Sequence, residues 1–409
     1  MQQTVTIKIK LLKHNIPEFD RLANQFTKSC DFVSQWIFEH NCELRLTILN
    51  KALYYDIRKR FNLKSQLAQS VIRCVVSKYK TVKTQIEKKP YRVWSGSYDK
   101  NQHKIYLSIK RDLTWLQKPI HFKQPQADLQ RNRDWSFVNN GKQLSINTLD
   151  KRIKVCYIVK GFDQYKSWKF GMAKLIKQGN TWYFFVSATK ELPDYQLSQT
   201  KHVVGIDRGI RFLATCYDEQ GNTKFFNGKH VSNIRNKYKK LRKQLQNKGA
   251  KSAKRRLKKI GHRENRWMID VNHQISKALV NYYGKDTLFV LEDLTGITFN
   301  TTKHRKKENR YEHHSWSFYQ LEQFLTYKAN LKGSKVIEVP AQYTSQRCIR
   351  CGRINKSNRN HDKHLYKCDK CGYSTNDDRI ASMNIQFLGT LYVSGNKHPR
   401  FVKPKTNNN

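Results

Sequence analysis

The sequence predicts an α+β protein of several domains: a β module split by a helical block, then an α/β domain interrupted by a cysteine-rich segment. Three observations support this fold class. The apolar period switches between strand and helix spacing along the chain, two CxxC pairs lie near the C-terminus, and the formal net charge is +48. The chain of 409 residues has room for two or three domains.

The N-terminal half contains three segments of different period. Residues 1–14 alternate apolar and polar side chains, which predicts a first strand. Residues 15–90 carry apolar side chains at helical spacing, which predicts three or four helices. Residues 91–195 alternate again, most clearly in the hairpin at 168–189. The pattern indicates a β module that begins with the first strand and resumes after the helical block.

The C-terminal half mixes short apolar strands with helices. Residues 196–344 include the strands HVVGID, RFLATCYD, TKFFN, TLFVLED and SKVIEVP, with helices between them. The cysteine-rich segment occupies 345–373, and a helix over 374–392 completes the α/β domain. Residues 393–409 are polar, and we expect a flexible tail there.

The cysteine pairs predict a zinc site. Cys348, Cys351, Cys368 and Cys371 form two CxxC pairs separated by sixteen residues, and a glycine follows each pair. Four thiolates complete a tetrahedral shell, so the predicted zinc is structural and leaves no position for water. The alternative interpretation is a pair of redox dithiols. The five remaining cysteines are scattered singly, which is typical of a reducing compartment.

Three acids stand where an acid is unexpected. Asp207 ends the apolar strand HVVGID, Glu292 ends TLFVL in the same way, and Asp378 lies at the start of the last helix. Carboxylates at strand ends and a helix start can converge on two Mg²⁺ ions, the arrangement that hydrolyses phosphodiesters.

Each acid also has a structural interpretation. Asp207 could form the following turn, and Glu292 could be a surface residue. Asp378 could cap the helix, although Asn376 and Asp377 compete for that position. The catalytic interpretation depends on finding all three acids in one basic region.

The charge predicts a polyanionic partner. The chain has 79 Lys and Arg against 31 Asp and Glu, and residues 229–266 hold sixteen of these cations with a single acid. A thin apolar stripe in this segment predicts a pair of helices, and their strongly basic face is typical of a surface that binds a phosphate backbone. The sequence shows no membrane anchor, lipidation motif or signal peptide, so we expect a cytoplasmic protein without a membrane partner.

Several motifs together resemble a known family. GIDRGI around Asp207, LEDL around Glu292, QYTSQRCIRCG, and CDKCGYSTNDDRIASMNI around Asp378 resemble the RuvC-type nuclease of TnpB proteins, which are transposon-encoded RNA-guided DNA endonucleases. Miniature CRISPR type V effectors are equally similar. The resemblance covers about residues 202–388 and implies an RNase H-like domain. It places the three catalytic, magnesium-binding acids at Asp207, Glu292 and Asp378.

The resemblance also implies an organisation and partners. The first strand and the β module would form a β-barrel-like wedge domain, split by a recognition domain over 15–90. A guide RNA would pair with target double-stranded DNA beside a short flanking motif, and the protein would act as a monomer or homodimer.

The chain departs from the family pattern at three positions. Arg208 follows the first acid where an apolar residue is usual, Ile380 replaces Asn, and Ser382 replaces Ala. Two alternatives to a guided nuclease remain: a guide-independent transposase or integrase, and a catalytically inactive RNA-guided repressor.

Overall fold

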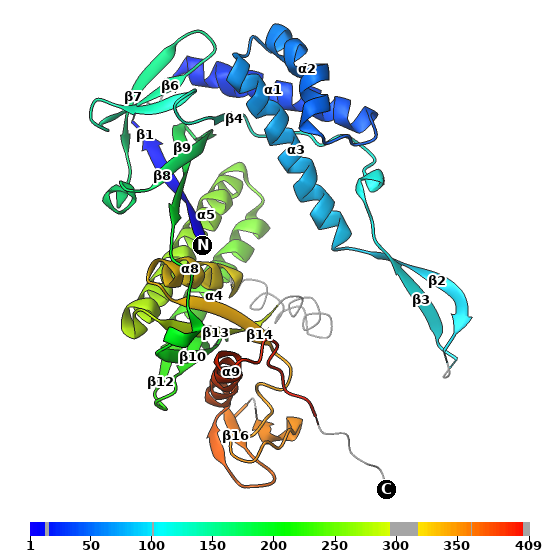
Figure 1. Ribbon diagram of the computed structural model, residues 1–409, viewed down its shortest axis with the longest axis vertical. Helices are drawn as coiled ribbons and strands as arrows, with labels where there is room; N and C mark the ends of the chain where they lie inside the picture. Colours follow the sequence, from blue (N-terminus) through cyan, green and yellow to red (C-terminus); the bar gives the residue numbers. More distant parts are fainter. Residues whose placement is uncertain (13–15, 100–101, 295–317, 361, 404–409) are drawn as a thin grey trace. The chain divides into compact units, whose positions relative to one another are not determined.

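The computed structural model describes residues 1–12, 16–99, 102–294, 318–360 and 362–403. Residues 2–190 form one compact unit, and Met1 with residues 191–409 forms another (Figure 1). Both units combine helices and strands, so the predicted mixed α and β composition is confirmed. No helix within the described ranges is long and apolar enough to cross a membrane.

The unit of residues 2–190 contains a seven-stranded sheet that includes the first strand. In spatial order its strands are β4 (Gln126–Leu129), β8 (Lys169–Gln178), β9 (Thr181–Glu191), β1 (Gln2–Leu11), β7 (Arg152–Ile158), β6 (Gln143–Asn147) and β5 (Trp135–Val138). The strand β1 lies between β9 and β7 and pairs with β7 in antiparallel register. Strands before and after the helical block therefore belong to one sheet.

Three helices form the block between β1 and the rest of this sheet. They are α1 (Pro17–Glu39), α2 (Leu46–Phe61) and α3 (Ser65–Glu87). Proline at the start of α1 fits the first turn, where no backbone donor is needed. Phe19 of α1 is fully buried, and its ring contacts Trp182 of β9 edge to face at 5.8 Å. The helices and the sheet therefore share one hydrophobic core.

A short two-stranded sheet follows α3 and is separate from the seven-stranded one. It consists of β2 (Tyr91–Tyr98) and β3 (Lys104–Ile109), which among the described strands pair only with each other (Figure 1). Alternation in the sequence predicts strands here but does not reveal that they leave the main sheet.

The second unit is built on a five-stranded sheet. Its spatial order is β12 (Thr223–Asn227), β11 (Phe212–Tyr217), β10 (His202–Asp207), β13 (Thr287–Asp293) and β14 (Lys335–Pro340). The first three strands are antiparallel neighbours, whereas β10, β13 and β14 run parallel. Parallel strands buried on both faces need continuous apolar runs, which is the composition of β10 and β13.

Helices cover both faces of this sheet. On one face, α5 (Lys251–Tyr283) and α8 (Phe318–Leu331) pack over Val204 and Phe289. On the other face, α9 (Asp377–Val393) packs over Val203 and Val290. The helix α4 (Lys229–Lys248) precedes α5, which continues unbroken beyond the basic segment 229–266 to Tyr283. Its thin apolar stripe hides this continuity in the sequence.

Two glycines allow α9 to lie directly on the sheet. A Cβ added at Gly205 of β10 would come within 2.2 Å of the Ser382 carbonyl oxygen, and one at Gly389 would come within 2.4 Å of Val290 Cγ2. Successive contacts show that α9 runs antiparallel to β10. Its first turn therefore reaches the carboxyl end of β10, where Asp207 lies.

The C-terminal segment differs in part from the expected flexible tail. The helix α9 extends to Val393, and Phe401 is buried with its ring stacked on Phe387 at 6.2 Å. The predicted boundary at residues 14–15 and tail residues 404–409 lie outside the described residues.

Candidate active site

The three predicted acids come to one edge of the five-stranded sheet. Parallel pairing of β10 with β13 places Ile206 opposite Leu291, so Asp207 and Glu292 follow at the same level on neighbouring strands. Asp378 lies in the first turn of α9 and is buried. Parallel strands end at a common edge, which is where functional side chains gather in such sheets.

Asp378 does not cap its helix. The side chain of Asn376 accepts hydrogen bonds from the backbone nitrogens of Asp378 and Arg379, at 3.0 and 3.1 Å. Asn376 is therefore the N-cap, and the capping interpretation of Asp378 is wrong. The Asp378 carboxylate faces other charged groups instead.

Burial and neighbouring charges together shift the pKa values of these acids. Burial, followed by the charges of Glu292 and Asp378, raises the pKa of Asp207 well above its ordinary value. Burial also raises the pKa of Glu292, although the Thr344 hydroxyl donates a 2.5 Å hydrogen bond to its carboxylate and opposes this shift. A divalent cation would relieve this repulsion, so the donor set fits Mg²⁺.

Arg359 is a charged partner of these acids that the sequence did not reveal. It lies on β15 (Arg359–Asn360), and its guanidinium contacts the carboxylates of Asp377 and Asp378 at 3.1 and 3.4 Å. Its positive charge also opposes the raised pKa of Asp207 and of Glu292. A single arginine among 79 cations has no local pattern that would have identified it.

Arg208, the unusual residue after the first acid, has a defined structural role. Its side chain is 1% exposed and pairs with Glu322 of α8 at 2.8 Å. It also donates a 2.5 Å hydrogen bond to the carbonyl oxygen of Glu292. Arg208 thus links the end of β13 to α8, and its charge also opposes the raised pKa of Glu292.

The two departures within α9 are accommodated locally. Ile380 is fully buried against Cys348, Cys368 and Tyr366. The Ser382 hydroxyl donates to the Arg379 carbonyl oxygen at 2.9 Å, so burial leaves it satisfied. Both substitutions leave Asp378 in the first turn of the helix.

The four predicted zinc ligands lie together. Their sulfur atoms are all within 4.8 Å of one another, with Cys348 to Cys371 at 3.6 Å and Cys351 to Cys368 at 3.5 Å. Sulfurs held tetrahedrally around zinc lie about 3.8 Å apart, given Zn–S bonds of about 2.3 Å. The spacing and the four-sulfur chemistry therefore fit zinc.

The cysteine-rich segment 345–373, which we call the finger, has two turns of the same geometry and leads into α9. Gly352 and Gly372 adopt φ values of 73° and 70°, and each donates its backbone nitrogen to the carbonyl oxygen of the first cysteine of its pair. The strand β17 (Ser374–Asn376) pairs with β16 (Leu365–Lys367) and leads directly into α9. Folding of the finger therefore fixes where the last helix begins.

The acids and the cysteines differ in how closely they gather. Within the described part of the chain, the cysteines are the set of three or more metal-binding side chains whose ligand atoms all lie within 4.8 Å. The three acids share one edge and one electrostatic field without forming so close a group.

Comparison with known proteins gives matches over the same regions. A family model described as "Cas12f1-like, TNB domain" matches residues 318–385, and one described as "Probable transposase" matches residues 186–295. A solved structure, the mini-RNA-guided endonuclease CRISPR-Cas_phi3, aligns over 95% of this chain and 93% of its own, at 12% identity and a TM-score of 0.45. That score is too low to identify a shared fold.

Two curated relatives share substantial sequence. The CRISPR-associated endodeoxyribonuclease Cas12f1 of Sulfoacidibacillus thermotolerans is 30% identical over 220 residues, which is 50% of each protein. The chain thus spans about half the length of that relative. A TnpB-like protein of Methanocaldococcus jannaschii is 30% identical over 194 residues, covering 45% of this chain and 68% of the relative. At this identity and coverage, the chain belongs to the TnpB-like family.

Proposed function

We propose that this protein is an RNA-guided DNA endonuclease. A guide RNA pairs with target double-stranded DNA beside a short flanking motif, and a RuvC-like site hydrolyses the DNA backbone. The observation that carries the proposal is the convergence of Asp207, Glu292 and Asp378 at one sheet edge. The relatives named for endonuclease activity support the same reaction.

The strand arrangement supports the predicted domains. Three antiparallel strands followed by two parallel ones, with acids on the central pair, support an RNase H-like domain over 196–344 and 374–392. The finger, residues 345–373, is inserted between these two parts of the domain. In the other unit, residues 1–14 and 91–195 correspond to the wedge domain and 15–90 to the recognition domain.

The protein's own groups prepare the site for metal. Asp207, Glu292 and Asp378 would hold two Mg²⁺ ions, which supply an activated water and stabilise the departing oxygen. Thr344 holds one oxygen of Glu292 by its hydrogen bond, so the other oxygen can face a ligand. The four cysteines would hold a structural zinc that orders the entry into α9.

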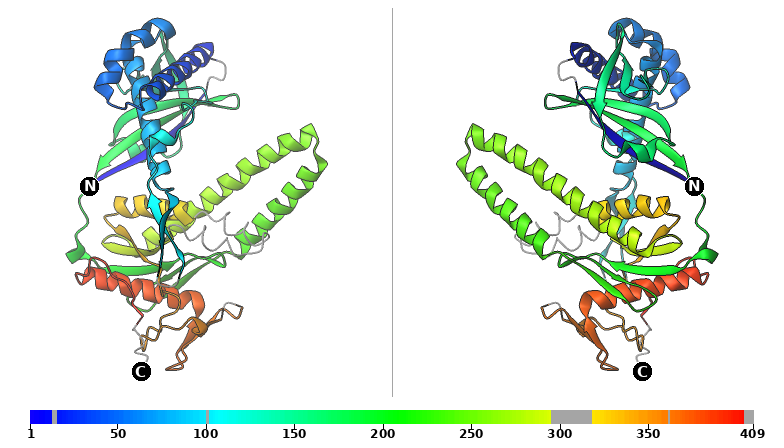
Figure 2. Two further views of the ribbon diagram at one scale, coloured as in Figure 1. Left: turned by 90° about the vertical axis from the view of Figure 1, so that its right-hand side faces the viewer. Right: turned by 90° about the vertical axis from the view of Figure 1, so that its left-hand side faces the viewer.

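The basic helical pair is the proposed phosphate-binding surface. Figure 2 shows α4 and α5 side by side as a long hairpin, and residues 229–266 of this pair carry sixteen Lys and Arg. The acid in this segment, Glu264, is paired with Arg242. Most of the charge is thus available to nucleic acid.

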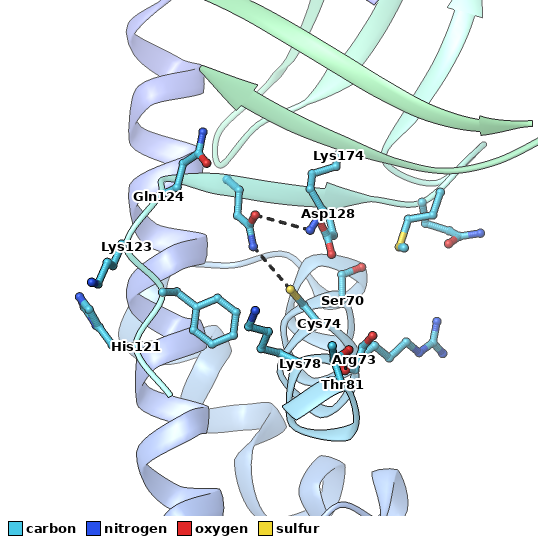
Figure 3. Close-up of a pocket in the computed structure, with 15 residues that line it drawn as sticks. Ser70, Arg73, Cys74, Lys78, Thr81, His121, Lys123, Gln124, Asp128 and Lys174 are labelled. Carbon is cyan, nitrogen blue, oxygen red and sulfur yellow. Dashed lines mark hydrogen bonds and ion pairs between the residues drawn. The ribbon is translucent and has the colours of Figure 1, made fainter. Parts of the chain in front are cut away.

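A basic pocket in the other unit supports the same partners. It has a volume of about 720 Å³ and is lined by α3, β4 and β8. Figure 3 shows Arg73, Lys78 and Lys123 around it, with Lys174 beside Asp128 at 3.2 Å.

Co-purifying RNA and cleavage of DNA test the proposal together. We expect a defined structured RNA with the purified protein, and Mg²⁺-dependent cutting of DNA that matches its guide segment. Glu292→Gln should lower the cleavage rate by on the order of 10³-fold or more, while the RNA remains bound. Asp293→Asn, an exposed neighbour on the same strand, is the matched control and should cleave normally.

Other outcomes would overturn the proposal. Cleavage or strand transfer without any RNA would favour a guide-independent transposase, in line with the description of one matching family model. Guided binding without cutting in Mg²⁺ or Mn²⁺ would favour an inactive repressor. Full activity of Glu292→Gln would remove Glu292 from the site.

A further inference from the structure

The β2–β3 hairpin exposes an unusual amount of apolar surface. Among its described residues, seven large apolar side chains are at least 40% exposed: Val93, Trp94, Tyr98, Ile105, Tyr106, Leu107 and Ile109. All six residues of β3 are exposed, and neither strand pairs with the seven-stranded sheet. An isolated two-stranded hairpin is only marginally stable in water, and an exposed apolar patch usually marks an interaction site.

The pairing register gives the hairpin two different faces. Val93 lies opposite Leu107, whereas Trp94 lies opposite Tyr106. Because successive side chains of a strand point to opposite faces, these two pairs lie on opposite sides of the ribbon. At these two pairs, one side of the ribbon is aliphatic and the other is aromatic.

The aromatic side also carries positive charge. Lys104 Nζ lies 5.3 Å from the centre of the Trp94 ring, and Tyr98 contacts Trp94 edge to face at 6.1 Å. Arg92 lies on the same side as Trp94, because it is two residues away on the same strand. We call Arg92, Trp94, Tyr98, Lys104 and Tyr106 the aromatic face.

The root of the hairpin anchors this surface. The Arg111 guanidinium lies 4.7 Å from the Trp115 ring and 5.9 Å from the Tyr91 ring, which contact each other at 4.9 Å. Tyr91 and Trp115 thus pack against a cation, although Trp115 still exposes 48% of its surface. Trp94 and Tyr106, farther along the ribbon, present about half of their surface to solvent, 47% and 51%.

The chemistry of the aromatic face matches unpaired nucleotides. Aromatic rings stack on the flat faces of bases, and neighbouring lysine and arginine neutralise phosphates. A DNA duplex also presents phosphates, but its bases are stacked on each other and do not offer their flat faces to a protein ring. Protein interfaces are also rich in aromatic residues and arginine but are depleted in lysine, so Lys104 is the residue that favours nucleic acid over a protein partner.

We propose that the aromatic face binds an unpaired segment of the guide RNA. This inference rests on the proposed function, in which the guide is the partner that stays bound before and after DNA is met. Exposed apolar strands invite aggregation, so a resident partner suits this surface better than a transient DNA strand. The site is distinct from the three acids, from the α4–α5 hairpin and from the pocket beside α3.

Two matched double variants test the assignment of the face. Trp94→Ala with Tyr106→Ala removes the aromatic pair, and Val93→Ala with Leu107→Ala removes its exposed aliphatic counterpart. The full-length Asp207→Asn protein serves as the background, so that cleavage does not alter the probe. Affinity is measured by fluorescence anisotropy with single-stranded oligouridylate of about 20 nucleotides, a length that exceeds common single-strand site sizes.

We expect the aromatic variant to bind the RNA probe about tenfold or more weakly, which is the loss of one good stacking contact. The aliphatic variant should bind as the parent does. Equal affinity of the aromatic variant and the parent would overturn the proposal, and so would an equal loss in both variants. A loss seen only with oligothymidylate would overturn RNA as the occupant.

Two further readouts separate this inference from the proposed function. A change of oligomeric state in the aromatic variant, with unchanged RNA affinity, would assign the face to a second copy of the chain and overturn the inference. If the wild-type protein shows no guided cleavage but the aromatic variant loses RNA affinity, the proposed function fails and the RNA-binding face stands. If cleavage is guided and RNA affinity is unchanged, the face assignment alone fails.

Discussion

The buried acid Asp128, in the unit of residues 2–190, faces a cation, whereas Asp207 at the edge of the five-stranded sheet lies near two other carboxylates. Asp128 is 4% exposed and lies 3.2 Å from Lys174. Burial disfavours the charge on Lys174, yet Asp128 offsets this, and the pKa of Lys174 is raised. Asp207 instead has a strongly raised pKa because of burial and of Glu292 and Asp378. The first arrangement stabilises a fold, and the second costs stability unless a cation is present.

This difference explains why one half of the chain has sharp motifs and the other has none. A metal site requires a carboxylate at each ligand position. Asp207 and Glu292 therefore stand out as charged residues at the ends of apolar strands. A sheet such as that of β1, β7 and β9 needs only alternation and volume, which many sequences supply.

Loss of zinc should produce the largest change in structure and activity. We expect the structural change to be confined to the unit that contains the finger. In Cys368→Ser we expect the finger to unfold, because zinc contributes about 10 kcal/mol or more to folding of such sites. The entry into α9 through β17 should then become disordered and cleavage should be lost. Metal analysis, hydrogen exchange of residues 374–385 and a cleavage assay measure these changes.

The control for the zinc prediction is Cys156→Ser, an exposed cysteine on β7 of the other unit. It should keep its zinc and its activity. Normal cleavage by Cys368→Ser would show that the finger does not position Asp378. Increased exchange in α1 or β4 would show that the units are less independent than their separate cores suggest.

The positions of the acids at one sheet edge and of the cysteines beside one another could be predicted because their patterns are local. Asp207 and Glu292 interrupt apolar runs, and each CxxC pair needs only a few residues. Arg359 and the role of Arg208 could not be predicted, since both depend on contacts between distant segments. Arg359 reaches the acids only because β15 folds back toward the first turn of α9.

The fold shows the same limit. Alternation identified β1 and the later strands, but not that β1 lies between β9 and β7. Periodicity also does not show that α5 continues past the basic segment 229–266 to Tyr283, because its basic half has few apolar residues. Strand partners and helix continuity are set by packing between elements, which a local pattern does not contain.

Removing an acid from the paired arrangement should destabilise the unit of residues 2–190. Asp128→Asn leaves Lys174 without its partner, and we expect a loss of about 1 kcal/mol, less than for a fully buried ion pair because the Lys174 side chain is 36% exposed. Calorimetry and hydrogen exchange of β4 and β8 measure the loss. Asp163→Asn, which breaks an exposed pair with Lys166, should leave the unfolding temperature unchanged. Equal effects of the two variants would contradict the comparison.

Removing an acid from the crowded arrangement should instead increase the stability of the folded protein. The raised pKa of Asp207 means that the folded protein holds a proton that the unfolded chain releases, so this residue costs stability increasingly as pH rises above its ordinary pKa. In buffer without divalent cations, Asp207→Asn should gain about 1 kcal/mol at neutral pH, within the range of single stabilising changes. The gain over wild type should be larger at neutral pH than at about pH 4, the ordinary pKa of an aspartate, where the unfolded chain still keeps part of its protons.

Mg²⁺ should reverse this advantage of Asp207→Asn. A ligand that binds only the folded state raises its stability, so wild type should gain more from Mg²⁺ than the variant, which has lost a ligand. Thermal unfolding is best followed after treatment with a mild chelating resin, with zinc content checked so that the finger stays loaded. A variant less stable than wild type in the absence of Mg²⁺ would mean that Arg359 already neutralises the three acids. The crowded edge would then resemble the paired arrangement of Asp128 and Lys174, and the contrast between the two units would be lost.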